Sequence, residues 1–309
     1  MTDFDRMLAG LRQPDAYPHP VGAVEHIETH ISHVLLAGDY AYKIKKEIDL
    51  GFLDFSTLER RRHFCEEEIR LNGRLAPSTY LGAVAITGTP ERPRMGGAGT
   101  VMEYAVKMRR FGQDRLLSVL PVTGELAERI AERVAAFHQE IPCAPEGSEY
   151  GMPEAVLRPM RGNFETIRAR LGDRGALARL ETLESWTLSR HRDLSRILEG
   201  RRRDGHIREC HGDMHRGNIA YESGQILIFD GIEFNPELRW IDTVSELAFL
   251  VMDLEEAGET SPARRLLNRY LEIGGDYGGL RLLEFYKVYR AMVRAKVTAI
   301  RLGQPDVES

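Results

Sequence analysis

The sequence has few of the residues that cross-link proteins, and it has no segment suited to crossing a membrane. Its 309 residues include only three cysteines, and no two of them form a Cys-x-x-Cys pair. We therefore expect neither a zinc cluster nor a disulfide framework, and free thiols are typical of the reducing cytoplasm. No run of eighteen apolar residues occurs, which excludes an obvious membrane-spanning helix.

We expect no targeting signal, and the chain has no strong charge of either sign. Its first five residues, MTDFD, show no basic stretch followed by an apolar run, so a signal peptide is not expected. The 47 acidic and 42 basic side chains give a net charge of -5. This mild acidic excess argues against a protein that coats nucleic acid. We expect a cytoplasmic protein with no nucleic-acid or membrane partner.

The composition is that of a globular protein, with 42% hydrophobic and 29% charged residues, and the length is sufficient for two domains. Strand and turn patterns dominate up to about residue 108, and helical periodicity dominates afterwards. We therefore predict an α+β fold. Residues 1–108 would form a small N-terminal lobe with an antiparallel sheet and one helix, and residues 109–309 a larger, mainly helical C-terminal lobe.

Turn residues separate the expected elements of both lobes. In the first lobe, Gly38-Asp39 is a hairpin turn, and residues 56–75 form the helix, capped by Ser56 and stopped by Pro77. The glycine-rich stretch at 96–99 is interpreted as a hairpin tip rather than a phosphate cradle, because no lysine-bearing helix follows it. The expected strands are residues 24–27, 33–37, 40–45, 80–87 and 100–108, and the expected later helices are 123–140, 174–199, 243–256, 262–272 and 280–302.

The segment HGDMHRGN at residues 211–218 carries the clearest chemical signal. Its aspartate is followed by an asparagine five positions later, the spacing of the catalytic loop of protein kinases. In that pattern the aspartate, Asp213, orients an acceptor hydroxyl and takes its proton as the catalytic base. Asn218 offers a neutral amide oxygen to Mg²⁺ without adding negative charge beside the phosphates.

A second acidic residue in the same region completes the metal-binding pattern. Residues 225–229 form an apolar strand that ends at Asp230, where a carboxylate can join a metal ion to nucleotide phosphates. The order here is Phe-Asp-Gly rather than Asp-Phe-Gly. The occurrence of Asp213, Asn218 and Asp230 in this order predicts phosphoryl transfer with ATP and Mg²⁺.

Residues 211–218, followed by Ile-Phe-Asp at 228–230, resemble the aminoglycoside phosphotransferase and choline kinase superfamily, whose motif runs HGDxHxxN with a later aspartate. The chain looks similar to bacterial aminoglycoside phosphotransferase-family proteins that are often fused to a C-terminal P-loop kinase-like ATPase domain. The resemblance implies a protein-kinase-like two-lobed fold and transfer of the γ-phosphate of ATP to an alcohol group. No G-x-x-x-x-G-K-[ST] motif occurs here, so a P-loop partner domain would lie outside this chain.

Two lysines on one expected strand are candidates for contacting the nucleotide phosphates. Ala-Tyr-Lys at residues 41–43 reproduces the end of the kinase V-A-I-K strand, which favours Lys43. Lys45 lies on the same strand face two residues later and is the alternative. A carboxylate of the following helix should orient the lysine. Of Glu66, Glu67 and Glu68, we favour Glu68, because its place in the helix suits the pattern of the resembled family.

The turn at residues 28–32 takes the place of the kinase glycine-rich loop, although it contains no glycine. The hydroxyl groups of Thr29 and Ser32 are candidate donors to phosphate oxygens, and an ordinary strand turn is the equal alternative. We expect the adenine edge to meet backbone groups within residues 107–111.

Other charged residues receive supporting or surface roles. Asp242 is expected to cap a helix, and the resemblance implies that it also braces the catalytic loop through backbone amides. A surface stripe is preferred to an anion site for Arg290, Arg294 and Lys296. A solvated helix face is likewise preferred to a polycation pocket for the acidic residues Glu233, Glu237, Asp253, Glu255 and Glu256.

The sequence does not distinguish among acceptors. A sugar, an amino sugar, an amino alcohol and an aminoglycoside-like molecule all fit the motif, because kinship of fold does not transmit substrate. The alternatives are a kinase that acts on a protein hydroxyl and a nucleotide-binding regulatory module that works with a P-loop kinase domain. The full set of Lys43, Asp213, Asn218 and Asp230 argues against an inactive kinase fold.

Overall fold

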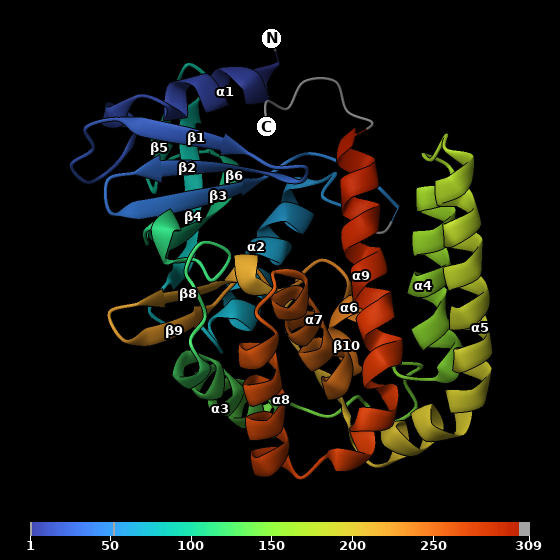
Figure 1. Ribbon diagram of the computed structural model, residues 1–309. Helices are drawn as coiled ribbons and strands as arrows, with labels where there is room; N and C mark the ends of the chain where they lie inside the picture. Colours follow the sequence, from blue (N-terminus) through green and yellow to red (C-terminus); the bar gives the residue numbers. More distant parts are fainter. Residues whose placement is uncertain (1, 52, 303–309) are drawn as a thin grey trace. The chain divides into compact units, whose positions relative to one another are not determined.

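The computed structural model describes residues 2–51 and 53–302 and shows two compact units (Figure 1). The first unit comprises Met1–Val119 and Asn218–Pro236, and the second comprises Leu120–Gly217 and Glu237–Ser309. The packing thus groups residues 109–119 and 218–236 with the sheet, whereas the division expected from the sequence placed them in the helical lobe. A backbone hydrogen bond of 2.9 Å from Leu117 to Ile219 helps to join these segments.

The first unit is built on an antiparallel sheet with the strand order β1-β2-β3-β6-β4-β5. The turn between β2 and β3 contains Gly38, whose φ of 58° lies in the left-handed region that glycine tolerates. The sequence analysis missed β5, an edge strand that contains a proline and lies between the expected strands 80–87 and 100–108. The strands are β1 (Val24–Glu28), β2 (Ser32–Ala37), β3 (Tyr40–Lys45), β4 (Tyr80–Thr89), β5 (Arg92–Met95) and β6 (Val101–Arg109).

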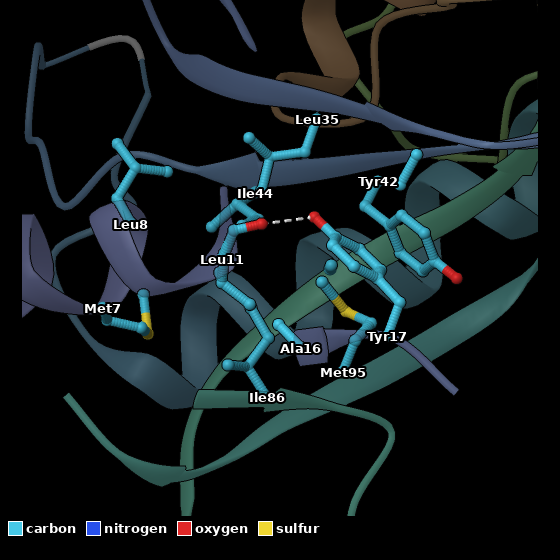
Figure 2. Packing of buried hydrophobic residues seen from close by; sticks show 12 residues of the cluster. Met7, Leu8, Leu11, Ala16, Tyr17, Leu35, Tyr42, Ile44, Ile86 and Met95 are labelled. Atoms are coloured by element: carbon cyan, nitrogen blue, oxygen red, sulfur yellow. Dashed lines mark hydrogen bonds between the residues drawn. The ribbon is translucent and has the colours of Figure 1, made fainter. Parts of the chain in front are cut away.

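Two α-helices, rather than the one expected, accompany this sheet among the described residues. α1 (Asp3–Leu11) begins with a capping box formed by Thr2 and Asp5. Figure 2 shows its apolar face packed against residues of the sheet, and the Tyr17 hydroxyl donates a hydrogen bond of 2.7 Å to the carbonyl oxygen of Leu11. α1 therefore completes the core on one face of the sheet.

The second helix of the unit is α2 (Leu58–Asn72), which begins one residue later than expected with Ser56 as the capping residue. Thr57 is the capping residue, because its hydroxyl accepts a hydrogen bond from the backbone N–H of Arg60. The unit also contains a short hairpin of β8 (Ile219–Glu222) and β9 (Gln225–Ile228).

The second unit is mainly helical, which confirms the α+β class. Its core is formed by apolar faces of α4, α5, α7 and α9, and Figure 1 shows α4 and α5 side by side. The sequence analysis missed α4, which contains Pro159. The elements are α3 (Gly124–Glu140), α4 (Pro153–Arg168), α5 (Arg174–Arg203), β7 (Ile207–Glu209), α6 (Pro236–Arg239), β10 (Trp240–Asp242), α7 (Thr243–Glu256), α8 (Thr260–Gly274) and α9 (Leu280–Leu302).

Among the residues that the structure describes, no helix combines the length and the apolar character needed to cross a membrane.

Candidate active site

A buried network of charged side chains lies in the first unit, where β3 and α2 present lysines and a glutamate to one another. The Lys43 ammonium donates to Glu68 Oε1 at 2.9 Å and to Asp230 Oδ1 at 2.6 Å. The Lys45 ammonium donates to Glu68 Oε2 at 2.7 Å and also to Glu233. Glu68 therefore bridges both lysines, as their position on one strand face allows.

The charges of this network stabilise one another against the cost of burial. Burial alone would lower the pKa of Lys43, but Asp230 and Glu68 raise that pKa well above its usual value. Burial opposes ionisation of Glu68 too, yet the two lysines lower its pKa to about 2. Glu233 differs, because the effect of burial exceeds that of Lys45 and raises its pKa. Lys43 and Glu68 are accordingly charged at neutral pH.

The contacts distinguish the two lysines. The side chain of Lys45 is 0% exposed and lies against Glu68 and Glu233, whereas Lys43 contacts Asp230, whose side chain is 50% exposed. Lys43 is thus the lysine that touches a partly exposed carboxylate, as a residue beside a ligand would.

Of the three successive glutamates, Glu68 accepts hydrogen bonds from both lysines. Glu66 pairs with Arg62 and Glu67 with Arg70, each at 2.9 Å. The ion pair between Lys43 and Glu68 that the sequence analysis favoured is present, while the role of both residues toward a nucleotide stays a prediction.

The β8–β9 hairpin brings the two proposed metal ligands to one end. Ile219 pairs with Ile228, and the next backbone hydrogen bond runs from Phe229 N–H to the carbonyl oxygen of Asn218 at 3.0 Å. Asp230 follows directly, so Asn218 and Asp230 occupy neighbouring positions although twelve residues separate them. The motif predicts the order of the two residues along the chain, and the hairpin brings them close together in space.

Two residues that the sequence analysis did not identify hold Asp230 in an unusual conformation. Asp230 has a φ of 61°, in the left-handed region that is uncommon for residues other than glycine. Its N–H donates to the Tyr80 hydroxyl at 3.1 Å, and the N–H of Gly231 donates to Asn72 Oδ1 at 2.7 Å. Such backbone strain persists where surrounding contacts fix it, and it concentrates at functional sites.

The turn between β1 and β2 holds the hydroxyl groups of Thr29 and Ser32. Thr29 Oγ1 donates to the Ser32 carbonyl oxygen and accepts from the Ser32 N–H, both at 3.0 Å. The Ser32 hydroxyl is buried and has no hydrogen-bond partner within residues 2–51 and 53–302. The Thr29 hydroxyl proton is thus already donated within the turn, which favours the interpretation as an ordinary strand turn over a phosphate-binding one. Contact of Thr29 or Ser32 with a phosphate stays a prediction.

In the second unit, the loop at residues 211–217 is held mainly by α7. Glu246 accepts the N–H of His211 at 3.1 Å and the N–H of Gly212 at 2.6 Å. Two turns further along the helix, Asp253 accepts the N–H of Arg216 at 2.9 Å. Backbone amides on both sides of Asp213 are therefore bound to carboxylates of one rigid helix.

Asp213 itself is partly accessible, with 34% of its side chain exposed. His215 Nε2 lies 3.5 Å from its carboxylate. Burial would raise the pKa of Asp213, but the hydrogen bond and charge of His215, together with His211 and Arg290, hold it below the usual value. The group is ionised at neutral pH and is able to accept a hydrogen bond from a hydroxyl.

No protein-family model matches the sequence. Uncharacterized proteins of Mycobacterium bovis and Mycobacterium tuberculosis are 36% identical over 307 residues, an alignment that covers 94% of this chain. The chain spans 58% of the length of these curated relatives.

Several solved structures resemble most of the chain. An aminoglycoside phosphotransferase of Alicyclobacillus acidocaldarius has a TM-score of 0.50 at 12% identity, and the match covers 93% of this chain and 88% of that one. A choline kinase of Cryptosporidium parvum has a TM-score of 0.53 at 10% identity, with coverage of 96% and 88%. This chain has the protein-kinase-like fold of aminoglycoside phosphotransferases and choline kinases. The predicted fold class is thereby confirmed.

The carboxylate that binds the backbone amides of the Asp213 loop is not Asp242, the residue that the resemblance implied. Asp242 caps α7 by accepting the Val244 N–H at 2.9 Å, as expected, and it also accepts hydrogen bonds from Arg201 at 2.6 and 2.8 Å. The loop amides are bound by Glu246 instead, because it lies one turn further along α7.

The expected surface stripe on α9 was wrong for Arg290. This side chain is buried and donates to the carbonyl oxygen of Gly212 at 2.9 Å and to Ser245 Oγ at 3.2 Å. The solvated face expected for the acidic residues was also wrong for Glu233 and Asp253, which are buried. Buried charges in this fold thus support the loop and the lysine network.

Glu246→Gln tests the brace. Burial would raise the pKa of Glu246, but His138 and the loop amides lower it to about 2. A depressed carboxylate pKa stabilises the fold above about pH 4.3 and loses that contribution as the pH falls toward 2. The glutamine amide presents a donor to a loop N–H, so we expect a loss of about 1–3 kcal/mol of unfolding free energy at pH 7. Urea unfolding measures it.

The matched control is Glu256→Gln, an exposed position on the same helix, which should change stability by less than about 0.5 kcal/mol. Equal unfolding free energies for the two variants would contradict the bracing role of Glu246.

Proposed function

We propose that this protein is an ATP-dependent phosphotransferase that moves the γ-phosphate of ATP to a hydroxyl group of a small molecule. The observation that carries the proposal is the network in which Glu68 binds Lys43, and Lys43 in turn touches Asp230. A lysine held by a helix carboxylate beside a metal-binding aspartate is the arrangement that kinases use on nucleotide phosphates.

The first unit supplies the residues for the nucleotide. Lys43 is charged and would neutralise the α- and β-phosphates, and Glu68 fixes its position. Asn218 and Asp230 fit Mg²⁺, because both present oxygen donors from the same end of a hairpin and half of the Asp230 side chain is exposed. When bound, Mg²⁺ would neutralise charge on the β- and γ-phosphates.

Asp213 in the second unit carries out the proton chemistry. Its ionised carboxylate accepts a hydrogen bond from the acceptor alcohol and orients the oxygen toward the γ-phosphorus. As the new O–P bond forms, the bond from the γ-phosphorus to the bridging oxygen breaks and ADP leaves. The alcohol proton passes to Asp213, so the atoms and charges balance.

The direct test measures ADP release with ATP and Mg²⁺ in the presence of sugars, amino sugars, amino alcohols and aminoglycosides. ³¹P NMR then identifies a phosphate ester on the acceptor. We expect acceptor-dependent ADP formation, and EDTA should abolish it because Asn218 and Asp230 cannot replace the charge of the ion. ADP release that EDTA does not affect would contradict the proposed metal role.

Two other outcomes would redirect the proposal. Label from γ-³²P-ATP on a protein rather than on a small molecule would establish a protein acceptor. Nucleotide binding without turnover on any acceptor would favour a regulatory module that works with a P-loop kinase-like domain, an alternative consistent with the greater length of the mycobacterial relatives.

A further inference from the structure

The backbone of Asp230 has a conformation that its place in the fold does not explain. Among the described residues, only Asp230 and Ser223 combine a positive φ, of 61° and 49°, with a side chain. Ser223 lies with Gly224 in the two-residue turn between β8 and β9, and tight hairpin turns of this kind use positive φ at both positions. Asp230 lies beyond the end of β9, outside any such turn, so contacts of its own must hold it.

The first of these contacts is made by a buried tyrosine. Tyr80, the first residue of β4, accepts a hydrogen bond of 3.1 Å from the Asp230 N–H through its hydroxyl. Its ring belongs to a buried apolar cluster that includes Ala220 of β8 and Leu227 of β9. The ring is therefore fixed relative to the hairpin that ends at Asp230. The packing belongs to the ring and the hydrogen bond to the hydroxyl, so the two contributions are separable.

The second contact comes from Asn72, the buried last residue of α2. Its Oδ1 accepts the N–H of Gly231 at 2.7 Å, and its Nδ2 donates to the carbonyl oxygen of Glu68 at 2.9 Å. Both bonds form only in this orientation of the amide, since an N–H needs an acceptor and a carbonyl needs a donor. Asn72 thus joins the residue after Asp230 to the helical turn that carries Glu68.

Together the hydrogen bonds close a ring of contacts around Asp230, entirely within the first unit. Lys43 joins the Asp230 carboxylate to the Glu68 side chain. Asn72 joins the Glu68 backbone to Gly231. The side chain and the backbone of this short segment are therefore both bound to α2. A return of φ to the negative values that aspartate prefers would redirect the carboxylate, and the ring opposes it.

We propose that Tyr80 and Asn72 are positioning residues that set the affinity for Mg²⁺, because they hold Asp230 in the left-handed conformation. This inference rests on the proposed function, since it concerns the metal ligand of the same reaction. When only a fraction of the molecules has the conformation that binds, the apparent affinity falls in proportion to that fraction. Each residue acts through a backbone N–H of residues 230–231 and not through contact with the ion.

Calorimetric titration of ADP, once with saturating Mg²⁺ and once with EDTA, isolates the contribution of the metal ion to binding. Tyr80→Phe removes the hydroxyl and keeps the ring. We expect the affinity for ADP in Mg²⁺ to fall about two- to tenfold, the effect of one lost hydrogen bond. The affinity in EDTA should not change, because Lys43 is retained. Asn72→Ala, which removes the bond to Gly231, should show the same pattern.

The matched control is Tyr17→Phe, at a buried tyrosine of the same unit whose hydroxyl donates to the Leu11 carbonyl oxygen at 2.7 Å. This variant also loses one buried hydrogen bond, so it should be less stable, but neither ADP titration should change. Hydrogen exchange followed by NMR gives a second readout without nucleotide or metal. The amide of Asp230 should exchange faster in Tyr80→Phe, and the amide of Gly231 should exchange faster in Asn72→Ala.

The outcomes separate this inference from the proposed function. A wild type that binds ADP with the help of Mg²⁺, together with a Tyr80→Phe variant that binds it equally well, would overturn this inference alone. Equal losses in Mg²⁺ and in EDTA, or unchanged exchange of the Asp230 amide, would also overturn it. A wild type that binds ADP equally well in both buffers would refute the proposed metal role and this inference together. If Tyr80→Phe weakens only the binding that depends on Mg²⁺ while no acceptor is ever phosphorylated, the inference stands and the phosphotransfer is refuted.

Discussion

Replacing Asp213 with asparagine is expected to lower the turnover number by about 10²–10⁴-fold, the usual contribution of a positioned general base. Asparagine keeps the size of the side chain and can still accept a hydrogen bond, but it cannot take the proton of the alcohol. ATP binding should persist, because Lys43, Asn218 and Asp230 lie in the first unit and are unchanged. Steady-state kinetics with the acceptor from the screen and calorimetric titration of ADP measure the two effects separately.

The matched control is Asp193→Asn, an exposed position on α5 whose side chain is 62% exposed, and it should leave turnover unchanged. The pKa of Asp213 lies below its usual 3.8, so the base stays ionised across the neutral range. In a plot of turnover number against pH, the loss of activity caused by protonation of Asp213 should therefore occur only below about pH 4. Full activity of Asp213→Asn on the true acceptor would remove Asp213 from its proposed role.

The sequence motif proposes Asp213, Asn218 and Asp230 from their order and spacing, and their chemical roles stay predictions. The ion pair between Lys43 and Glu68, expected from a strand and the next helix, is present in the structure. The residues that orient them lack such a signal. Glu246 and Arg290 hold the Asp213 loop from 33 and 77 positions further along the chain, so only the folded structure brings them there.

The elements that the sequence analysis missed are also ones that long-range contacts stabilise. α1 stabilises the first unit by packing Met7, Leu8 and Leu11 onto the sheet, yet its nine residues are too few to be distinguished by periodicity alone. β5 and α4 were not predicted, and both contain a proline, a residue that usually interrupts a strand or helix. In both cases tertiary packing overrides a local preference.

Lys45→Met is expected to destabilise the protein by about 3–5 kcal/mol at pH 7.5, the cost of removing one partner of a buried ion pair. Lys45 is fully buried between Glu68 and Glu233. Glu68 would keep Lys43 as its partner, so the loss of the Lys45 charge acts mainly on Glu233, whose pKa burial already raises.

The effect of pH identifies Glu233 as the source of the loss. A carboxyl group whose folded pKa exceeds its unfolded value of about 4.3 destabilises the fold increasingly as the pH rises through the folded pKa, and the penalty disappears below the unfolded value. The gap between Lys45→Met and the wild type should therefore narrow from pH 7.5 to pH 5 in urea unfolding. The neighbouring Lys46→Met removes an ion pair with Glu28, which is 58% exposed, and should cost less than about 1 kcal/mol at either pH. If the two methionine variants were equally stable, the buried lysine would have no structural role, and Lys45 would again compete with Lys43 for the nucleotide.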